Sequence, residues 1–216
     1  MLPPPGYLAE IQRLCRVHGT LMVLDEVQTG FGRTGRMFAC EHAAVSPDII
    51  CLSKALTGGY LPLGATATSE SVYEAFLSDD RTKTFFHGHS FTANPLACAV
   101  AIASLDLFHD TGALNRVRDL EGWLRQGLAP LAALRSVGEV RVIGGVGVVE
   151  LVADKTSKTA AGYLDDVGPR LSAAFLDRGL LLRPLGNILY FMPPYVVTEN
   201  ETAWAIEQIQ DVLSGV

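Results

Sequence analysis

The chain has 216 residues, of which 49% are hydrophobic and 19% charged, and a net charge of -6 at pH 7. This length supports one large or two modest domains, and this composition excludes a disordered chain. The basic residues form no stripe, and the apolar stretches end well before the roughly 20 residues of a membrane span. We therefore expect no nucleic-acid partner and no membrane partner. The N-terminus lacks the pattern of a secretory signal, so we expect a cytoplasmic protein.

The cysteines indicate neither a metal site nor a disulfide framework. All four are far apart and none forms a C-x-x-C pair: Cys15, Cys40, Cys51 and Cys98. A zinc site or a disulfide-rich domain would need close, paired spacings. We expect four small buried side chains in a reducing cytosol, and no metal.

Helical and strand patterns alternate over the first part of the chain. Residues 7–18 have apolar positions at helical spacing, and residues 21–24 and 49–52 are short apolar runs typical of buried parallel strands. Residues 63–68 have the pattern of a third strand. This alternation predicts an α/β sheet covered on both faces.

The second part of the chain begins with two predicted helices. Asn94 and Pro95 suit the cap and first position of a helix that reaches about Phe108, and a second helix is predicted over residues 114–134. The pattern then changes to strands at 140–143 and 146–152, a helix at 164–177, a hairpin of 180–183 with 188–192, and a helix from about Glu199. This order predicts a smaller α+β domain, and we place the division at 1–112 and 113–216.

Lys54 differs from the other lysines of the sequence. It follows the apolar run 49–52, whereas the other three lie in polar surroundings: Lys83, Lys155 and Lys158. A lysine partly desolvated at a strand end has its pKa lowered toward the nucleophilic amine, which covalent chemistry with a carbonyl group requires. The alternative is a lysine that extends its amine into water from the strand end.

Asp25 ends the neighbouring apolar run, and ligands of α/β sheets bind at the carboxyl ends of the strands. A carboxylate there can bind a metal, act as a base or neutralise a cationic ring. The last role is the one that pyridoxal phosphate needs, because a protonated ring nitrogen makes the ring an electron sink. A solvated or helix-capping aspartate is the alternative.

Three further motifs have weaker signals. Residues 30–35 match G-x-G-x-x-G, with Asp48 downstream, but carboxylates precede the first glycine and no long helix pattern follows, which argues against dinucleotide binding. His87 and His89 could bind a metal, yet no acidic cluster is nearby. Arg183 is a lone cation inside the predicted hairpin, and a substrate carboxylate is one of several partners it could have.

Three segments together resemble the class III (ornithine-type) aminotransferases, which use pyridoxal phosphate. They are residues 24–35 (LDEVQTGFGRTG), 47–59 (PDIICLSKALTGG) and 85–97 (FFHGHSFTANPLA), in the family's order. The resemblance implies the PLP-dependent transferase fold type I. Residues 1–112 would be the C-terminal part of the cofactor-binding large domain, and residues 113–216 the small domain.

The resemblance also implies roles for individual residues. Lys54 would hold the cofactor and move a proton, Asp25 would pair with the ring nitrogen, and Gln28 would contact the ring. Ser90 would reach the phosphate bound by the neighbouring subunit of a homodimer. Three more residues would line the substrate: Gly88, Arg183, which would bind its carboxylate, and Tyr190.

Within the family, residues 38–43, 85–90 and 183–195 are most similar to the branch of biotin biosynthesis. That branch implies a keto-amino acid as amino acceptor and S-adenosylmethionine as amino donor. An ornithine or acetylornithine type of aminotransferase is the alternative. The family's upstream half supplies a Gly-Ser phosphate turn and an aromatic residue that stacks on the ring. Because this sequence contains neither, a non-catalytic remnant of the family is a second alternative.

Overall fold

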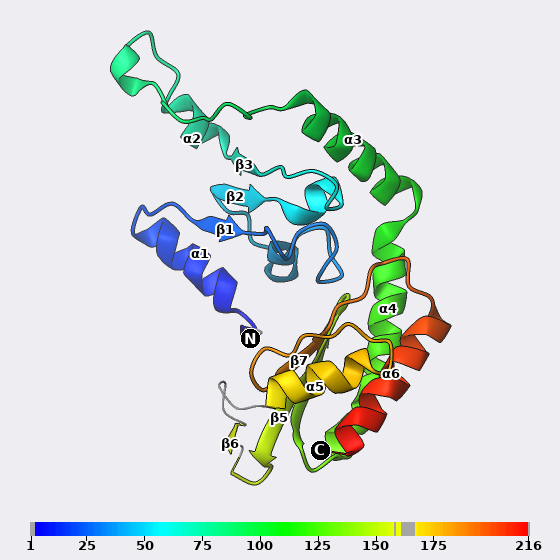
Figure 1. Cartoon of the computed structure of the whole chain (residues 1–216). Helices are drawn as coiled ribbons and strands as arrows, with labels where there is room; N and C mark the ends of the chain where they lie inside the picture. The colour runs from blue at the N-terminus through cyan, green and yellow to red at the C-terminus, as the bar shows by residue number, and fades with distance from the viewer. Residues whose placement is uncertain (1–2, 158, 161–166, 216) are drawn as a thin grey trace. The chain divides into compact units, whose positions relative to one another are not determined.

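The computed structural model describes residues 3–157, 159–160 and 167–215. The chain forms two compact units, Met1–Ala113 and Leu114–Val216 (Figure 1). Among the described residues, no single helix is long and apolar enough to cross a membrane, and only the helical segments Pro95–Asp110 and Ala113–Ala133 together, as a bent pair, reach that length and hydropathy.

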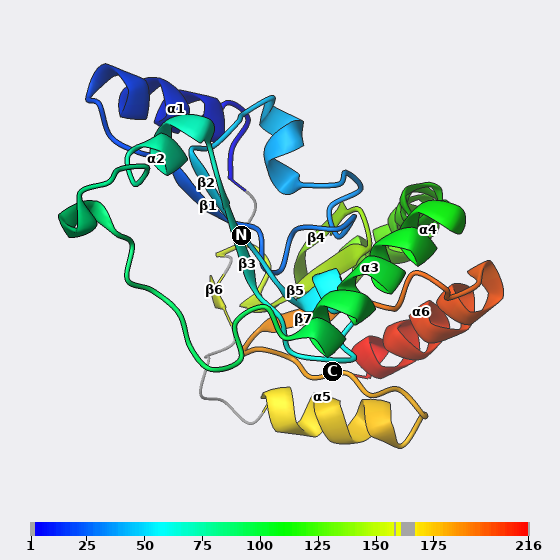
Figure 2. The same cartoon turned by 90° about the horizontal axis from the view of Figure 1, so that it is seen from above.

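The first unit is built around a short sheet with the strand order β1-β2-β3 (Figure 1), which Figure 2 shows from above. Strands β1 and β2 are parallel, as predicted, and β3 is antiparallel to β2. In chain order, the elements are α1 Tyr7–Val17, β1 Val23–Asp25, η1 Ala39–Ala43, β2 Ile49–Leu52, η2 Lys54–Thr57, β3 Ala65–Thr68, α2 Glu70–Glu74, η3 Arg81–Lys83 and α3 Pro95–Asp110, where η denotes a 3-10 helix.

The prediction that this sheet is covered on both faces is wrong for the described chain. Every residue of β3 is exposed and every residue of β2 is only half-buried. The β-branched and aliphatic residues that favour strands are present, but the helices of this unit bury few of them. The expectation of four buried cysteines is also wrong for three of them, since Cys40 is buried and the other three are half-buried.

Helix α3 begins as the sequence predicted. The side chain of Asn94 accepts hydrogen bonds from the backbone N–H groups of Leu96 at 2.9 Å and Ala97 at 3.3 Å. Pro95 occupies the first turn, where its missing N–H costs nothing. The helix then continues to Asp110, two residues beyond the predicted end.

A small core ties α3 to the loops that follow β1 and β2. It consists of Phe31, Leu56 and Ala101, with partly buried apolar neighbours that include Phe38. The rings of Phe31 and Phe38 meet edge to face, with centroids 5.8 Å apart. This core fixes the loop after β1 against η2, the turn that contains Lys54.

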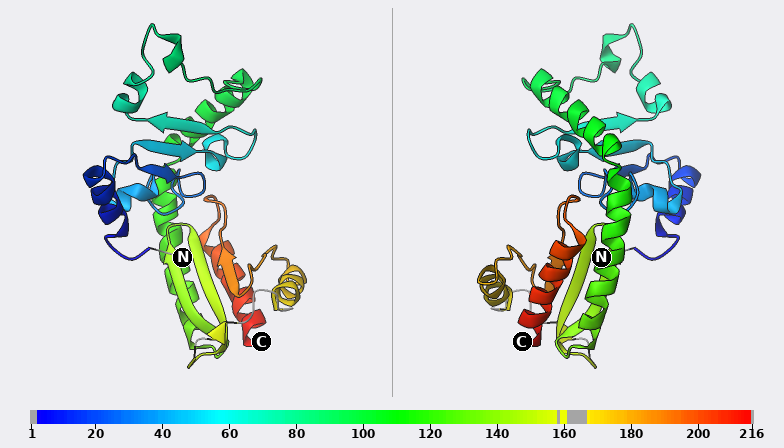
Figure 3. Two further views of the ribbon diagram at one scale, coloured as in Figure 1. Left: turned by 90° about the vertical axis from the view of Figure 1, so that its left-hand side faces the viewer. Right: turned by 90° about the vertical axis from the view of Figure 1, so that its right-hand side faces the viewer.

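The second unit has a larger core. Its elements are α4 Ala113–Leu128, η4 Ala129–Ala133, β4 Val137–Ile143, β5 Val146–Asp154, β6 Thr159–Ala160, α5 Val167–Leu176, β7 Ile188–Phe191 and α6 Glu199–Ser214. Figure 3 shows α4 alongside β4 and β5. Five residues of α4 and η4 are fully buried at helical spacing: Val117, Leu120, Leu124, Leu128 and Leu131.

Two predictions for this unit differ from the structure, and a third lies partly outside the described residues. The helix predicted over 114–134 changes to a 3-10 helix at Ala129, because Pro130 cannot donate the hydrogen bond that an α-helix needs. The helix predicted over 164–177 is described from Val167, since residues 164–166 lie outside the described part. The predicted hairpin is wrong: β7 pairs with β5, and residues 180–183 form no strand.

The turn at the centre of that hairpin is nevertheless present. Leu185 and Ile188 form an isolated antiparallel bridge around Gly186, which has a φ of 58°. Pro184 cannot donate to a strand ladder, so the pairing stops there. The terminal helix α6 starts at Glu199, as predicted.

Candidate active site

The carboxyl ends of β1 and β2 carry the residues that the sequence singled out. In the parallel pair, Asp25 is the last residue of β1 and lies opposite Cys51 of β2. Strand β2 ends at Leu52, and Lys54 begins η2 two residues later. Asp25 and Lys54 therefore follow neighbouring strands at the same edge of the sheet, where α/β proteins bind ligands.

Lys54 has a backbone conformation that few side-chain-bearing residues adopt. Its φ is 45°, in the left-handed region, and the preceding Ser53 has φ -166° and ψ -149°. Left-handed backbone costs a residue with a Cβ about 1–2 kcal/mol. Such strain persists only where the surrounding structure holds it, and it concentrates at functional sites.

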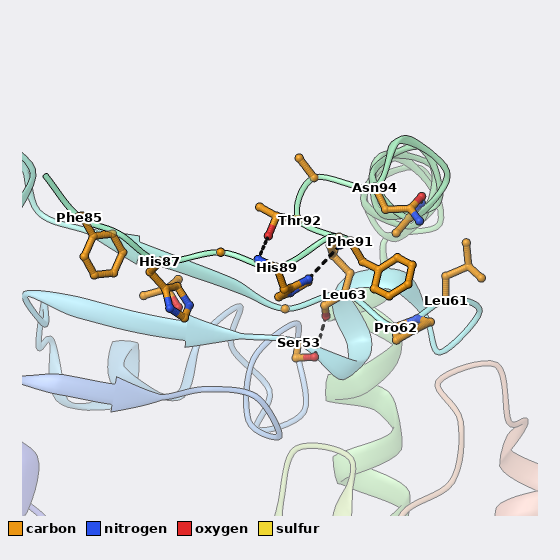
Figure 4. A pocket seen from close by; sticks show the side chains of 15 residues that line it. Ser53, Leu61, Pro62, Leu63, Phe85, His87, His89, Phe91, Thr92 and Asn94 are labelled. Atoms are coloured by element: carbon orange, nitrogen blue, oxygen red, sulfur yellow. Dashed lines mark hydrogen bonds between the residues drawn. The ribbon is translucent and has the colours of Figure 1, made fainter.

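Two hydroxyl groups hold this turn in place. Ser53 Oγ donates to the carbonyl oxygen of Leu63 at 2.7 Å, and Thr57 Oγ1 donates to that of Leu61 at 2.6 Å. Figure 4 shows the contact between Ser53 and Leu63. Thr57 is buried, with 2% of its surface exposed. The two contacts link both ends of η2 to the loop before β3.

The amine of Lys54 contacts Gln28. Lys54 Nζ donates to Gln28 Oε1 at 2.6 Å, across 26 positions of sequence. The structure thus brings together two of the residues predicted to contact the cofactor. The expected partial desolvation of Lys54 is not seen: its side chain is exposed, because it extends beyond the strand from η2.

Asp25 is exposed at the same edge. Its Oδ1 accepts a hydrogen bond from the backbone N–H of Val27 at 2.9 Å, which fixes the carboxylate at the start of the loop that contains Gln28. An exposed carboxylate at a strand end can pair with a cationic group of a ligand.

The loop after β1 does not have the geometry of a dinucleotide site. The helix that follows residues 30–35 is η1, a 3-10 helix of only five residues. Asp48 Oδ2 accepts from the backbone N–H of Met22 at 2.7 Å, so this carboxylate joins the segments that lead into β1 and β2. Both observations contradict the dinucleotide interpretation.

An open pocket of about 920 Å³ lies within the first unit, between Ser53, the loop 61–64 with the start of β3, and residues 85–94. Ser53, Gly88, His89 and Thr92 are among the residues that line it (Figure 4). Thr92 Oγ1 accepts from the backbone N–H of His89 at 3.0 Å and holds this segment in a turn. Ser90 is exposed in the same turn but does not line the pocket.

The two predicted substrate residues of the second unit have different environments. Tyr190 is half-buried in β7 and pairs with Val148 of β5. Arg183 is exposed, in contrast to the cation enclosed by a hairpin that the sequence predicted. The difference follows from the absence of a strand at 180–183. An exposed guanidinium can bind a carboxylate without first leaving another site.

Sequence reasoning missed three residues that support this site: Glu26, Ser53 and Thr57. Glu26 is buried, with 3% of its surface exposed, although it is adjacent to exposed Asp25. Hydroxyl residues on both sides of Lys54 were a visible signal, because serine and threonine commonly hydrogen-bond to nearby backbone. Nothing in the sequence indicated that the side chain of Glu26 is buried.

Cys40 is not a nucleophile of this site. Burial raises the pKa of its thiol above the usual 9.0, and the neighbouring charge of Glu26 raises it further. The thiolate is the reactive form, so the raised pKa makes this cysteine unreactive at neutral pH.

Known proteins of one family match nearly the whole chain. The family described as aminotransferase class-III matches residues 1–213. The adenosylmethionine-8-amino-7-oxononanoate aminotransferase of Synechococcus elongatus is 47% identical over 98% of this chain and 48% of its own length. The enzyme of the same name from Geobacter sulfurreducens is 44% identical over 97% and 47%. The chain spans about half the length of the curated relatives it matches.

Solved structures give the same result. The adenosylmethionine-8-amino-7-oxononanoate aminotransferase of Methanocaldococcus jannaschii matches with a TM-score of 0.94 and 36% identity, over 100% of this chain and 51% of its own. An (S)-enantioselective omega-transaminase from Thermomicrobium roseum matches with a TM-score of 0.93 and 37% identity, over 99% and 47%.

Proposed function

Because the chain belongs to the class-III aminotransferase family, we propose that it is part of an enzyme that transfers an amino group with pyridoxal phosphate as cofactor. The observation that carries this proposal is the contact of Lys54 with Gln28 at the carboxyl ends of the parallel strands β1 and β2. The amine of Lys54 and the amide of Gln28 lie at the edge of the sheet where β1 ends with the carboxylate of Asp25.

The residues present fit this cofactor. An exposed amine is free to form a covalent bond with an aldehyde, and Lys54 is accessible in this way. The exposed carboxylate of Asp25 can hold a proton on a ring nitrogen. A pair of opposite charges about 4 Å apart at an effective dielectric near 20 gains about 4 kcal/mol before desolvation.

When bound, pyridoxal phosphate supplies a ring that withdraws electrons from the amino-bearing carbon of a substrate. The other functions belong to the protein. Lys54 Nζ would hold the cofactor and, once released, take up and return a proton. Asp25 would keep the ring nitrogen protonated, and the amide of Gln28 would orient the ring and the lysine.

Four further residues have proposed roles. In a homodimer, the hydroxyl of Ser90 would donate to the phosphate group of the cofactor bound by the neighbouring subunit. Gly88 would line the pocket of that phosphate. Arg183 would bind a substrate carboxylate and Tyr190 would lie beside the substrate. Their support is the family resemblance of residues 85–97 and 183–195, together with the exposure of Ser90 and Arg183. A homodimeric complete enzyme in the cytoplasm is part of the same proposal.

For the substrates, we propose 8-amino-7-oxononanoate as amino acceptor, giving 7,8-diaminononanoate in biotin biosynthesis, and S-adenosylmethionine as amino donor. The support is that curated relatives of 40–47% identity carry the corresponding name. The second candidate is another omega-aminotransferase, of the ornithine or acetylornithine type. It is favoured by the omega-transaminase structure, which matches as well as the biotin-pathway one.

The test needs a complete chain as well as the 216 residues. This chain would be joined to the upstream half of the Synechococcus relative, and amino transfer to 8-amino-7-oxononanoate would be measured with three donors. The expected result is turnover with S-adenosylmethionine and little with glutamate or ornithine. Turnover of ornithine with this acceptor or with a 2-oxo acid, but none with S-adenosylmethionine, would support the second candidate, and no turnover with any of these pairs would support a non-catalytic remnant.

The 216 residues alone should show no more than trace activity. They lack the Gly-Ser phosphate turn that the family's upstream half supplies, and a helix N-terminus of that kind is a strong phosphate site. Robust turnover by the purified 216-residue chain would contradict this expectation.

A further inference from the structure

Glu26 is the one charged residue that is buried among the residues the structure describes. It follows Asp25 at the end of β1, and its backbone N–H donates to the carbonyl oxygen of Cys51 at 2.9 Å, which extends the pairing of β1 with β2. A buried carboxylate is costly unless hydrogen bonds satisfy it. The functions assigned above to Asp25, Gln28 and Lys54 make no use of it.

The carboxylate of Glu26 accepts three hydrogen bonds from the loop that follows it. Oε2 accepts from Thr29 Oγ1 and from the backbone N–H of Ala39 at 3.0 Å. Oε1 accepts from the backbone N–H of Cys40 at 2.8 Å. Because the donors lie at both the start and the end of residues 27–40, the carboxylate closes this loop.

The backbone of the same residue fixes the start of the loop. The carbonyl oxygen of Glu26 accepts from the N–H of Gly30 at 2.9 Å. A Cβ at position 30 would lie 2.8 Å from that oxygen, so only glycine allows this approach. Gln28 lies in the middle of this turn, between Thr29 and the strand end, and its amide reaches Lys54 Nζ.

We propose that Glu26 is a positioning residue that holds Gln28 and Asp25 in place opposite Lys54. The proposal rests on the function proposed for Lys54. The described hydrogen bonds of the Glu26 side chain go to Thr29, Ala39 and Cys40, so Glu26 acts on Gln28 through the loop. Hydrogen bonds from backbone N–H groups to a carboxylate are among the stronger ones in proteins, so those of Glu26 can hold the loop in one conformation.

Glu26→Gln is the direct test, because it keeps the shape and changes the hydrogen bonding. The amide has one acceptor oxygen and one NH₂ group, so its NH₂ group would face the N–H of Ala39 or Cys40. The measurement is the ¹H–¹⁵N spectrum of the 216-residue chain, followed at the side-chain amide of Gln28. It compares the shift caused by Lys54→Ala in the wild-type chain with the shift caused in Glu26→Gln.

The expected result is that Lys54→Ala moves the Gln28 resonance in the wild-type chain and leaves it unmoved in Glu26→Gln, because the contact between the two side chains is already lost. Glu41→Gln is the matched control. Glu41 is an exposed carboxylate of η1, directly after this loop, and it accepts from the N–H of Phe38 at 3.0 Å. In that background Lys54→Ala should move the resonance as in the wild type.

If Glu26→Gln does not fold, Thr29→Val is the second variant. It removes one donor and keeps the carboxylate with its two backbone partners, so the effect of Lys54→Ala on Gln28 should be reduced. An unchanged effect of Lys54→Ala in a folded Glu26→Gln chain, or in Thr29→Val when Glu26→Gln is unfolded, would overturn the proposal.

The proposed function can fail independently of this inference. The spectra contain no cofactor, so they test only whether Glu26 controls the contact of Gln28 with Lys54. Failure of the proposed function would instead appear as an equal reaction of pyridoxal phosphate with all lysines of the wild-type chain. The spectra therefore test the role of Glu26, and the labelling of lysines tests the proposed function.

Discussion

Lys54 donates a 2.6 Å hydrogen bond to Gln28, although the two residues are 26 positions apart in the sequence. One belongs to the strained turn after β2 and the other to the loop after β1. Their contact links the two segments that carry the proposed cofactor contacts. Its consequences for stability and chemistry can be measured in the chain as it stands.

The left-handed backbone of Lys54 predicts an unusual order of stabilities. At a φ of 45°, Lys54→Gly should be more stable than Lys54→Ala by about 1 kcal/mol, because glycine adopts positive φ without strain. Urea unfolding of both variants measures the difference. At Lys83, in η3 and without positive φ, the order should be reversed. Equal stabilities of the two Lys54 variants would show that the turn carries no strain.

Ser53→Ala tests the hydroxyl contact that holds this turn. Loss of the 2.7 Å hydrogen bond leaves the carbonyl oxygen of Leu63 without this donor, and the expected loss of stability is about 1 kcal/mol. Ser71→Ala is the control, because this exposed hydroxyl contacts only Ser69 among the hydrogen bonds described. A similar effect of both changes would argue against a specific role of Ser53.

The packing of the second unit predicts a large effect of one added methyl group. A Cβ at Gly147 in β5 would lie 2.4 Å from Leu128 Cδ1, so Gly147→Ala should lower the free energy of unfolding by about 1–3 kcal/mol. In Gly122→Ala the added Cβ meets nothing within 4 Å, and the higher helix propensity of alanine in α4 should raise the free energy of unfolding by about 1 kcal/mol. Thermal unfolding of the two variants provides the comparison. Destabilisation by both would contradict the packing described.

The cap of helix α6 predicts a pH dependence. Hydrogen bonds from the backbone N–H and then the hydroxyl of Thr198 lower the pKa of Glu201 from its ordinary 4.5. A carboxyl with a lowered pKa in the folded state stabilises fully above its unfolded pKa and loses this effect as the pH falls through the folded value. The difference in melting temperature between wild type and Glu201→Gln should therefore shrink below about pH 4.5. If the difference in melting temperature did not change with pH, the lowered pKa of Glu201 could not be its cause.

Much of the fold could be predicted from local patterns. The helix at residues 7–17, the cap at Asn94, the strand at 49–52 and the start of α6 all follow from periodicity and capping residues. The sequence-based fold class, a partial PLP-dependent transferase of fold type I, is confirmed by solved transaminases with TM-scores above 0.9. The predicted division at residue 112 and the predicted roles of the site residues stay predictions.

Other features depend on contacts distant in sequence, which local patterns do not contain. The pairing of β7 with β5 removed the expected hairpin and left Arg183 exposed. The exposure of Lys54 and of β3 reflects which residues cover the sheet, and the inward direction of Glu26 depends on donors 13 and 14 positions away. For the candidate site, residue identity was therefore predictable, but burial and supporting contacts were not.

The proposed function depends on Lys54 as the residue that holds the cofactor. The most direct measurement is to incubate the 216-residue chain with pyridoxal phosphate, reduce it with borohydride and locate the label by mass spectrometry on its four lysines, Lys54, Lys83, Lys155 and Lys158. We expect the label to concentrate on Lys54 and to be lost in Lys54→Ala. Label spread equally over the four lysines, or label of unchanged amount in Lys54→Ala, would contradict it.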